Sequence, residues 1–419
     1  MLSADIIYIL IIAVVAASSV AEFFLSRLNH SHAGRPIPSL LEGIYDDEKY
    51  RKQQAYTAIN YRFSTLQSFC MLAIIMLMLF TGGFGFLGVV VENISNNLII
   101  QAIIFFFMLA LASDIIGIPF EIYDTFVIEE KFGFNNTTIK TYIVDKIKTW
   151  LLSAIVGGGL LALITWIYYQ TPEYFWLLAC LVFVAFSIMM NLLYSDLIVP
   201  LFNKQKPLEE GELKQSIEDL ASKAGFSIKR IMVIDGSKRS TRANAYFSGL
   251  GPRKRVVFYD TLLNTLSHNE VLAVLAHEIG HYRKRHIVAG MVISTISMAI
   301  TLYIMSLFLR LPVFSEALGF SNASFHSGLL VFAFVYTPVS AVLSVLSNIV
   351  SRRNEFSADE WASRLRPAGH LISALKKLAS LNMVNLTPHP LYVFFSYSHP
   401  PLLQRIETLL HNDAKNKEK

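Results

Sequence analysis

Seven long apolar stretches constrain this chain of 419 residues more than any other feature. Each is close to the ~20 residues that a helix needs to cross about 30 Å of hydrocarbon. With 53% hydrophobic and 16% charged residues, and a mean hydropathy of +0.47, the chain is too apolar for an ordinary soluble protein. The first stretch lacks a basic leader and a clear cleavage site, so we expect a retained helix. The predicted spans are residues 5–25, 64–90, 98–120, 149–170, 174–200, 287–311 and 327–350.

Basic residues gather in every second connection between these spans. Because positively charged loops stay in the cytoplasm, the alternation predicts an outward N-terminus and a cytoplasmic C-terminus, as seven spans require. The net charge of +5 is spread over these loops, which does not indicate binding to nucleic acid. The basic connections are residues 26–62, 120–150 and 203–285, with fifteen Lys and Arg in the last, whereas the connections 91–98, 171–173 and 312–326 have none.

The sequence H-E-I-G-H begins at His277. On a helix, positions i and i+4 share a face, so His277 and His281 can bind one metal ion. Glu278 is placed to take a proton from a metal-bound water. Ser267 and Glu270 fit the capping box of a helix that leads into the motif. Two ordinary surface histidines would look the same, and the motif is expected by chance in roughly one such sequence in a hundred, so a second feature is needed.

Glu355 and Asp359 form this second feature. They lie four residues apart in a segment from Ser351 that looks like the start of another helix, so both carboxylates share one face. A catalytic zinc ion commonly has three protein ligands, and two histidines with one glutamate is a known set. Glu355 is then the third ligand, and Asp359 is placed to orient a ligand histidine from behind. The alternative is a solvated acidic face beside Arg352 and Arg353.

The longest soluble segment precedes the motif. Helical periodicity runs from about 208 to 224, and residues 228–234 have the pattern of a strand. Two more predicted strands, 244–247 and 256–259, are joined across a glycine-rich turn at 249–252. A sheet edge beside a protease metal commonly binds an extended peptide by strand addition, but a purely structural hairpin would have the same pattern.

Several spans contain polar residues that are costly in lipid. An ionisable group at the bilayer centre costs ~2.5–3.5 kcal/mol on insertion scales, and such groups usually face a bundle interior or a water-filled cavity. They are consistent with a transport pathway, with a hydrated chamber around a reaction site, or with snorkelling towards the interface. The residues are Glu22, Gln67, Asp114, Glu121, Asn191 and Asp196.

Three sequence blocks together resemble the signature of the type I CAAX prenyl endopeptidases, which are integral-membrane zinc metalloproteases. The resemblance covers nearly the whole chain, from about residue 30 to 410, and includes the number of spans. The blocks are His277–His281, Glu355–Asp359 and Tyr397–Arg405, and the resemblance extends to Ile128–Asn135, Pro200–Asn203 and Asn244–Phe247.

The resemblance implies a mainly α fold, in which a seven-transmembrane-helix bundle encloses a chamber and carries a small cytoplasmic α+β zinc metalloprotease domain. One zinc ion per chain would be bound by His277, His281 and Glu355. Glu278 would act as general base and acid, and Asp359 would support a ligand. The other residues implied are His399, a catalytic residue that stabilises the oxyanion or holds substrate, and three residues that would bind substrate. Of these, Asn244 and Tyr246 would pair with the substrate backbone, and Arg405 would have either a structural role or one in binding the substrate carboxylate.

These expectations divide the chain into four parts that alternate between membrane and cytoplasm. The parts are residues 1–203 with five transmembrane helices, 204–286 with the soluble α+β segment and the motif helix, 287–350 with two transmembrane helices, and 351–419 with a cytoplasmic helical segment that supplies the third metal ligand.

The function that follows is a membrane-embedded zinc metalloendopeptidase, in which zinc lowers the pKa of its water towards ~7 and Glu278 takes the proton. The family removes the last three residues of prenylated proteins that end in C-a-a-X. One alternative is a membrane-protein quality-control zinc protease with non-prenylated substrates, and another is a transporter that uses the intramembrane carboxylates. The expected partners are membrane lipids and a peptide or protein, prenylated or not. The membrane would be the inner membrane of a bacterium or the endoplasmic reticulum of a eukaryote.

Overall fold

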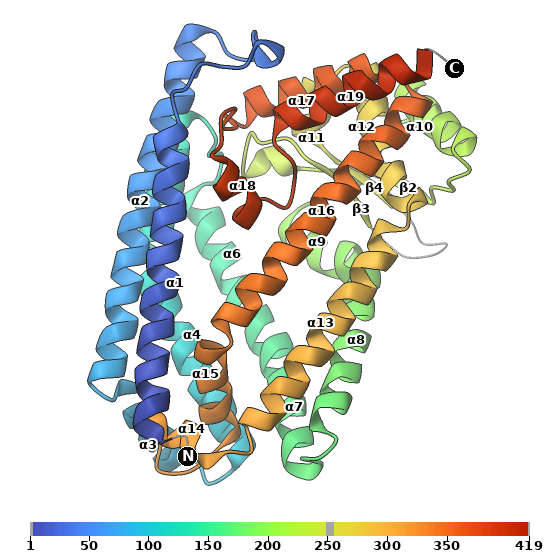
Figure 1. Cartoon of the computed structure of the whole chain (residues 1–419). Coiled ribbons are helices and arrows are strands. Elements are labelled where there is room, and N and C mark those ends of the chain that lie inside the picture. Colours follow the sequence, from blue (N-terminus) through green and yellow to red (C-terminus); the bar gives the residue numbers. More distant parts are fainter. Residues whose placement is uncertain (1–2, 249–254, 418–419) are drawn as a thin grey trace.

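The computed structural model describes residues 3–248 and 255–417 of the chain. Within them the protein is mainly helical with one small sheet, as the sequence predicts (Figure 1). Among the described residues, six helices are long and apolar enough to cross a membrane, and there are seven if the bent pair α15 (Phe325–Val335) and α16 (Thr337–Leu365) counts as one span. The turn predicted at residues 249–252 lies outside the described residues.

The apolar helices stand side by side as a bundle (Figure 1). Three of the spans contain a π-helical turn, a local widening that is frequent at functional sites. The helices of this part are α1 (Ala4–His32), α2 (Asp47–Phe80), α3 (Gly83–Ile94), α4 (Leu98–Tyr123), α5 (Glu130–Phe132), α6 (Ile139–Leu152), α7 (Gly158–Gln170), α8 (Phe175–Leu193), α9 (Val199–Phe202), α13 (His286–Phe308) and α14 (Pro312–Ala317). The π turns are Asp124–Glu129, Ser153–Gly157 and Tyr194–Ile198.

The predicted span 64–90 is two helices rather than one. α2 ends at Phe80 and α3 begins at Gly83. Gly82, between them, has a φ of 68°, in the left-handed region that glycine enters at the least steric cost. The sequence pattern missed this break because the residues on both sides are equally apolar.

The last predicted span, 327–350, is bent by 59° where α15 meets α16. Pro338 in the first turn of α16 explains the break, because proline lacks an N–H and clashes with the preceding turn. No glycine or proline follows it in α16, which continues well past the apolar stretch. The expected helix start at Ser351 is therefore wrong, and Glu355 and Asp359 lie on the same helix as the apolar residues before them.

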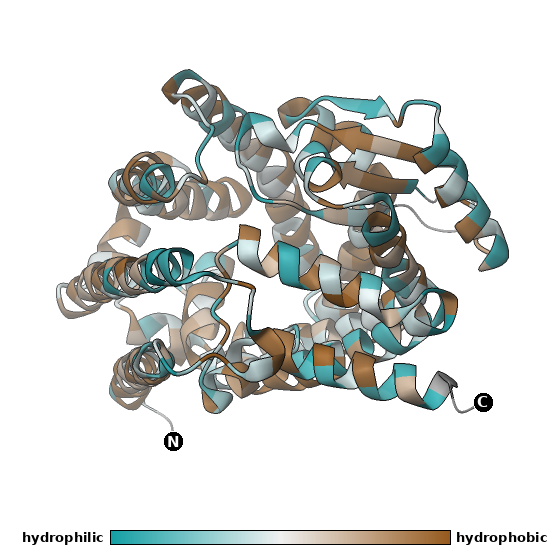
Figure 2. Cartoon of the chain, turned by 90° about the horizontal axis from the view of Figure 1, so that it is seen from above, coloured by the Kyte–Doolittle hydropathy of each residue, from teal (hydrophilic) through white to brown (hydrophobic). Residues whose placement is uncertain are grey.

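A four-stranded sheet forms the centre of the part of the protein that lies at one end of the bundle, the sheet part (Figure 1). Its strands lie in the order β1 (Gln205–Pro207), β2 (Arg230–Ile234), β4 (Arg255–Tyr259) and β3 (Ala245–Ser248), with β2 and β4 parallel and the two outer strands antiparallel to their neighbours. The central strands are mainly hydrophobic and one outer strand is hydrophilic (Figure 2). The helices of this part are α10 (Glu212–Lys223), α11 (Asp260–Thr265), α12 (His268–Arg283), α17 (Ala368–Leu381), α18 (Pro390–Ser396) and α19 (Leu402–Lys417).

One hydrophobic core holds the sheet part together. Ile231 and Phe258 of the sheet, Leu275 of α12 and Leu371 of α17 are all buried in it. The predicted helix and strands of this segment are confirmed, with their ends shifted by a few residues.

Ion pairs accompany several of the polar residues in the spans. Lys146 Nζ lies 2.7 Å from Asp114 and 2.8 Å from Glu121. Arg255 of β4 donates two hydrogen bonds of 2.6 Å to Asp196, in the π turn after α8. A charged partner offsets the cost of placing a carboxylate in or near the membrane, and the second pair also ties the sheet to the bundle.

Candidate metal centre and active site

The helix α12 presents the H-E-I-G-H motif. It starts with the predicted capping box, in which the backbone N–H of Ser267 donates to Glu270 at 2.7 Å. Gly280, inside the motif, faces α16 at very short range, since a Cβ added there would lie 3.0 Å from the carbonyl oxygen of Ala358. The glycine thus allows α16 to approach α12 closely enough to bring Glu355 to the two histidines.

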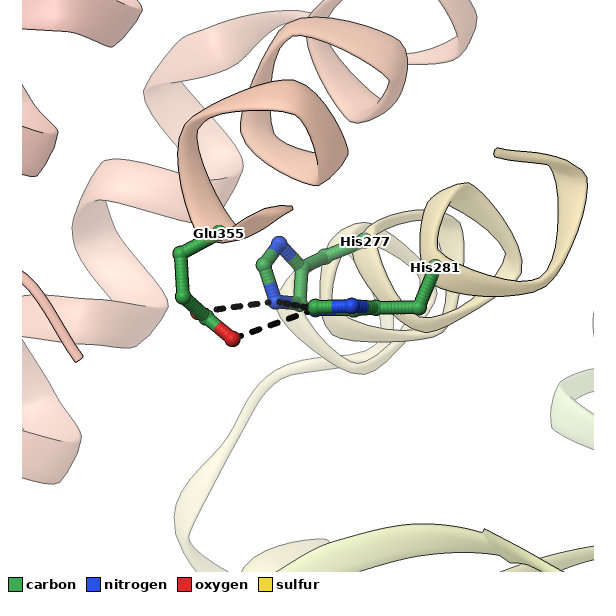
Figure 3. A group of neighbouring side chains, drawn as sticks. All are labelled: His277, His281 and Glu355. Atoms are coloured by element: carbon green, nitrogen blue, oxygen red, sulfur yellow. Dashed lines mark hydrogen bonds and ion pairs between the residues drawn. The ribbon is translucent and has the colours of Figure 1, made fainter. Parts of the chain in front are cut away.

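His277, His281 and Glu355 point toward one another (Figure 3). The Nε2 atoms of the two histidines are 3.2 Å apart, and the Glu355 oxygens lie 3.5 Å from His277 Nε2 and 3.2 Å from His281 Nε2. At the 2.0–2.2 Å bond lengths of zinc, ligand atoms of a tetrahedral site are about 3.3–3.6 Å apart. The three residues therefore fit a metal site of this size, with a fourth position left for a water molecule or substrate.

The outer nitrogens of both histidines already have partners. His277 Nδ1 donates to Asp359 at 2.8 Å, and His281 Nδ1 lies 3.1 Å from His286 Nδ1. When these nitrogens carry the protons, the two Nε2 lone pairs face each other at 3.2 Å and repel unless a cation lies between them. Without metal, burial disfavours the charged imidazole, but hydrogen bonds to Asp359 and Glu355 raise the pKa of His277 to about 9, so a proton takes that place.

Arg405 lies behind the metal centre rather than in front of it. Its guanidinium donates to both oxygens of Asp359, at 2.8 and 2.6 Å, and lies 3.4 Å from Glu355. Its side chain is 11% exposed. Asp359 is placed behind His277, as the helix spacing predicts. Arg405 is not among the residues that line the cavity on the other side of the metal centre, which is described next.

A cavity of about 500 Å³ opens in front of the metal centre. Glu278, His281 and Glu355 line it, together with Tyr246 of β3 and His399. His399 Nε2 is 3.5 Å from Glu355 and its side chain is 67% exposed, so it is free to meet a substrate. Asn244, by contrast, is exposed just before β3, where its side chain accepts a hydrogen bond from the Ala245 N–H, and it is not part of this lining.

The position of His286 was not predicted from the sequence. It is the first residue of α13, and Arg285 before it has a φ of 57°, which ends α12 and turns the chain back towards His281. The only signal in the sequence is a histidine five residues after the motif, and nothing in its spacing indicates a sharp turn between two helices.

A helical membrane bundle that carries an H-E-x-x-H helix and a third carboxylate in one cluster defines a membrane-embedded metalloendopeptidase. Residues 27–204 match the family model described as CAAX prenyl protease N-terminal, five membrane helices, and residues 207–413 match that of peptidase family M48. The chain belongs to peptidase family M48, and it is a multi-pass membrane protein.

Full-length relatives support this assignment. The chain is 33% identical to CAAX prenyl protease 1 of Saccharomyces cerevisiae, over 96% of each sequence. It is 31% identical to the CAAX prenyl protease 1 homolog of Homo sapiens, over 89% of this chain and 88% of the other. The crystal structure of S. mikatae Ste24p has a TM-score of 0.92 at 32% identity and covers 96% of this chain and 99% of that one.

Proposed function

We propose that this protein is a zinc metalloendopeptidase that removes the C-terminal tripeptide from prenylated proteins ending in C-a-a-X. The observation that carries this proposal is the cluster of His277, His281 and Glu355, whose spacing suits zinc and whose open side faces a cavity beside β3. The set of two nitrogens and one oxygen also favours zinc over magnesium or calcium, which prefer oxygen ligands. The names of the full-length relatives support the prenylated substrate.

The chemistry is divided between two residues that face the cavity. When bound, zinc polarises the scissile carbonyl and acidifies a water molecule. Glu278 accepts the proton of that water and later delivers it to the leaving amine. Burial raises the pKa of Glu278, which suits a carboxylate that has to take and then return a proton. His399 donates a hydrogen bond to the oxyanion that forms on the substrate.

The supporting residues keep these groups in place. Asp359 holds the ring of His277, and Arg405 holds Asp359 through its two hydrogen bonds. The substrate backbone adds to the sheet as a further strand beside β3, with Tyr246 against its side chains and Asn244 at the end of the strand. The edge position of β3 in the strand order supports this arrangement.

The basic connections between the spans support an orientation with the N-terminus outside and the sheet part in the cytoplasm. Prenylated proteins reach the membrane from the cytoplasmic side, so this orientation presents the metal centre to them. In a bacterium the membrane would be the inner membrane, and in a eukaryote that of the endoplasmic reticulum.

The proposal is tested with purified protein and a fluorogenic C-a-a-X peptide, with and without a farnesyl group. We expect cleavage after the cysteine and a clearly higher kcat/KM for the farnesylated peptide. Equal cleavage of both peptides would instead favour a quality-control protease that shares the metal centre. Cleavage at another bond would contradict the proposed release of a tripeptide.

A further inference from the structure

A second and larger cavity lies beside the catalytic one, between α8 and α13. Its volume is about 800 Å³, within the ~300–1,000 Å³ of small-molecule sites. Much of its wall is apolar, with Phe183, Phe186 and Met190 on α8 and Met291 and Met298 on α13. These five residues are half-buried. Part of each side chain packs against the protein, and the rest is exposed surface that an apolar guest can cover.

Beyond this cavity, on the side away from the metal centre, the two helices are in close contact. There, α8 and α13 pack in one hydrophobic cluster in which Cys180, Leu302 and Met305 are buried. Trp176 and Tyr303 meet edge to face, with ring centroids 5.6 Å apart. A guest in the cavity would therefore end against this packed cluster.

The other end of the cavity joins the catalytic one. Tyr246 and Phe247 of β3, and Gly290 and Ser294 of α13, line both cavities. A Cβ added at Gly290 would meet no heavy atom of the described residues within 4 Å, so the missing side chain leaves this junction open. In a peptide paired with β3, a single residue could thus lie near the metal centre with its backbone and reach the apolar cavity with its side chain.

We propose that this cavity binds the isoprenyl chain of the substrate, so that α8 and α13 recognise the lipid while α12 and α16 cut the peptide. The inference rests on the proposed function. The lipid is attached to the cysteine just before the scissile bond, and it therefore has to enter a space that adjoins the catalytic cavity. Methionine and phenylalanine side chains suit a branched, flexible hydrocarbon, because methionine adapts to irregular shapes and burial of the chain removes apolar surface from water.

Photo-crosslinking tests the assignment directly. A C-a-a-X peptide whose farnesyl group carries a diazirine in its last isoprene unit is bound to the full-length Glu278→Gln protein, which keeps the peptide intact. We expect labels on α8 and α13, reduced by excess unlabelled farnesylated peptide and not by the peptide without lipid. Labels confined to other helices, or labels removed equally well by a phospholipid, would overturn the assignment.

The substitution Gly290→Leu tests it through catalysis. A Cβ at this position meets no heavy atom of the described residues within 4 Å, so the longer side chain would extend into the open junction, and leucine favours the helix more than glycine does. By excluding about two methylene groups of the guest, it should lower the ratio of kcat/KM for farnesylated over unprenylated peptide roughly tenfold. Gly117→Leu in α4 is the matched control, because a Cβ there also meets no described atom within 4 Å, and it should leave the ratio unchanged.

The two proposals fail in different ways. If wild-type protein cleaves both peptides equally, the proposed preference for prenylated substrates is wrong, and the proposed lipid site is wrong as well. If the protein prefers the farnesylated peptide but the crosslinks lie elsewhere, or Gly290→Leu keeps the wild-type ratio, only the assignment of this cavity is wrong.

Discussion

His277 and His281 differ in the partner of the ring nitrogen that points away from the metal position. A carboxylate, Asp359, accepts from His277 at 2.8 Å, whereas a second imidazole, His286, faces His281 at 3.1 Å. Both partners fix the ring and leave Nε2 free for a metal, but only the carboxylate adds negative charge. Arg405 offsets that charge through its contacts with Asp359.

His286 is expected to position His281 rather than to touch substrate. The substitution His286→Phe keeps a ring of similar size and removes the nitrogen that holds His281, so the metal should be retained roughly 10–100-fold less tightly. Competition with a chelator, followed by measurement of the metal content, gives the affinity. His268→Phe, at the start of the same α12 helix and outside the metal cluster, is the control, and equal metal retention in both variants would contradict a positioning role.

Glu278 is expected to act on protons and not on the metal. Glu278→Gln preserves the shape of the side chain but removes the base, so turnover should fall by ~10²–10⁴-fold while the metal content stays at the wild-type level. His277→Ala should lose metal and turnover together, because one of three ligands is gone. Metal content by mass spectrometry and cleavage of the peptide are measured on the same preparations, and a Gln variant that keeps its activity would rule out the assigned role.

For single residues, the sequence predicts which side chains share a helix face, because this depends only on their spacing. His277 and His281 share a helix face whatever the fold, and Glu355 with Asp359 does so as well. The location of Arg405 behind Asp359 depends on how α19 crosses α16, and no local pattern contains that information. His286 depends on a left-handed residue between two helices, at an arginine where such a backbone is unusual.

Among the elements, α12 is held at its start by the buried carboxylate of Glu270. Glu270 in its first turn is 4% exposed and accepts hydrogen bonds from the Ser267 N–H, from Ser373 at 2.6 Å and from Lys377 at 2.8 Å. Burial alone would raise the pKa of Glu270, but the bonds to Lys377 and Ser373 lower it from 4.5 to about 2. One carboxylate therefore fixes the start of the motif helix and joins it to α17.

Glu270→Gln should destabilise the protein in a pH-dependent way. Because the folded-state pKa lies below the ordinary value, the charged carboxylate stabilises the fold fully above pH 4.5 and progressively less as the pH falls towards about 2. The melting temperature in detergent should thus differ between wild type and variant at pH 7, and the difference should shrink by pH 4. Glu218→Gln on the exposed face of α10 is the control, and a difference that grows on acidification would contradict this account.

The helices that the sequence misjudges share one cause. Apolar composition predicts how much chain can lie in the membrane but says little about where a helix bends, which here depends on Gly82 and Pro338. Conversely, the polar residues after Ser351 do not end α16, since a helix continues through polar sequence when nothing in it breaks the backbone pattern.

In the whole molecule, charged pairs connect the sheet part to the membrane bundle. Besides Arg255 with Asp196, Arg239 lies 2.7 Å from Asp145 of α6, and Arg242 lies 2.9 Å from Glu129. All three arginines belong to the sheet segment, and all three carboxylates belong to the bundle. The seven predicted spans agree with the described helices if the bent pair counts as one span. These contacts could not be predicted from the sequence, because they join residues about 60 to 110 positions apart.

The two members of the Arg255–Asp196 pair should differ in what their loss costs. The Arg255 side chain is 9% exposed and that of Asp196 is 45% exposed. Removing Asp196 leaves a buried guanidinium without its bidentate partner, whereas removing Arg255 leaves a carboxylate that the protein only partly encloses. Asp196→Ala should therefore lower the free energy of unfolding by about 2 kcal/mol, and Arg255→Met by clearly less.

Thermal unfolding of both variants and of the double variant in one detergent separates these effects. The double variant should be more stable than Asp196→Ala alone, because the buried guanidinium that had lost its partner is then absent. If Arg255→Met were the more damaging of the two, the pair would act through packing of the arginine stem under β4 rather than through its charge. The attachment of the sheet to the membrane bundle would then depend mainly on apolar contacts, and the same test on Arg239 and Asp145 would show whether that holds for the whole interface.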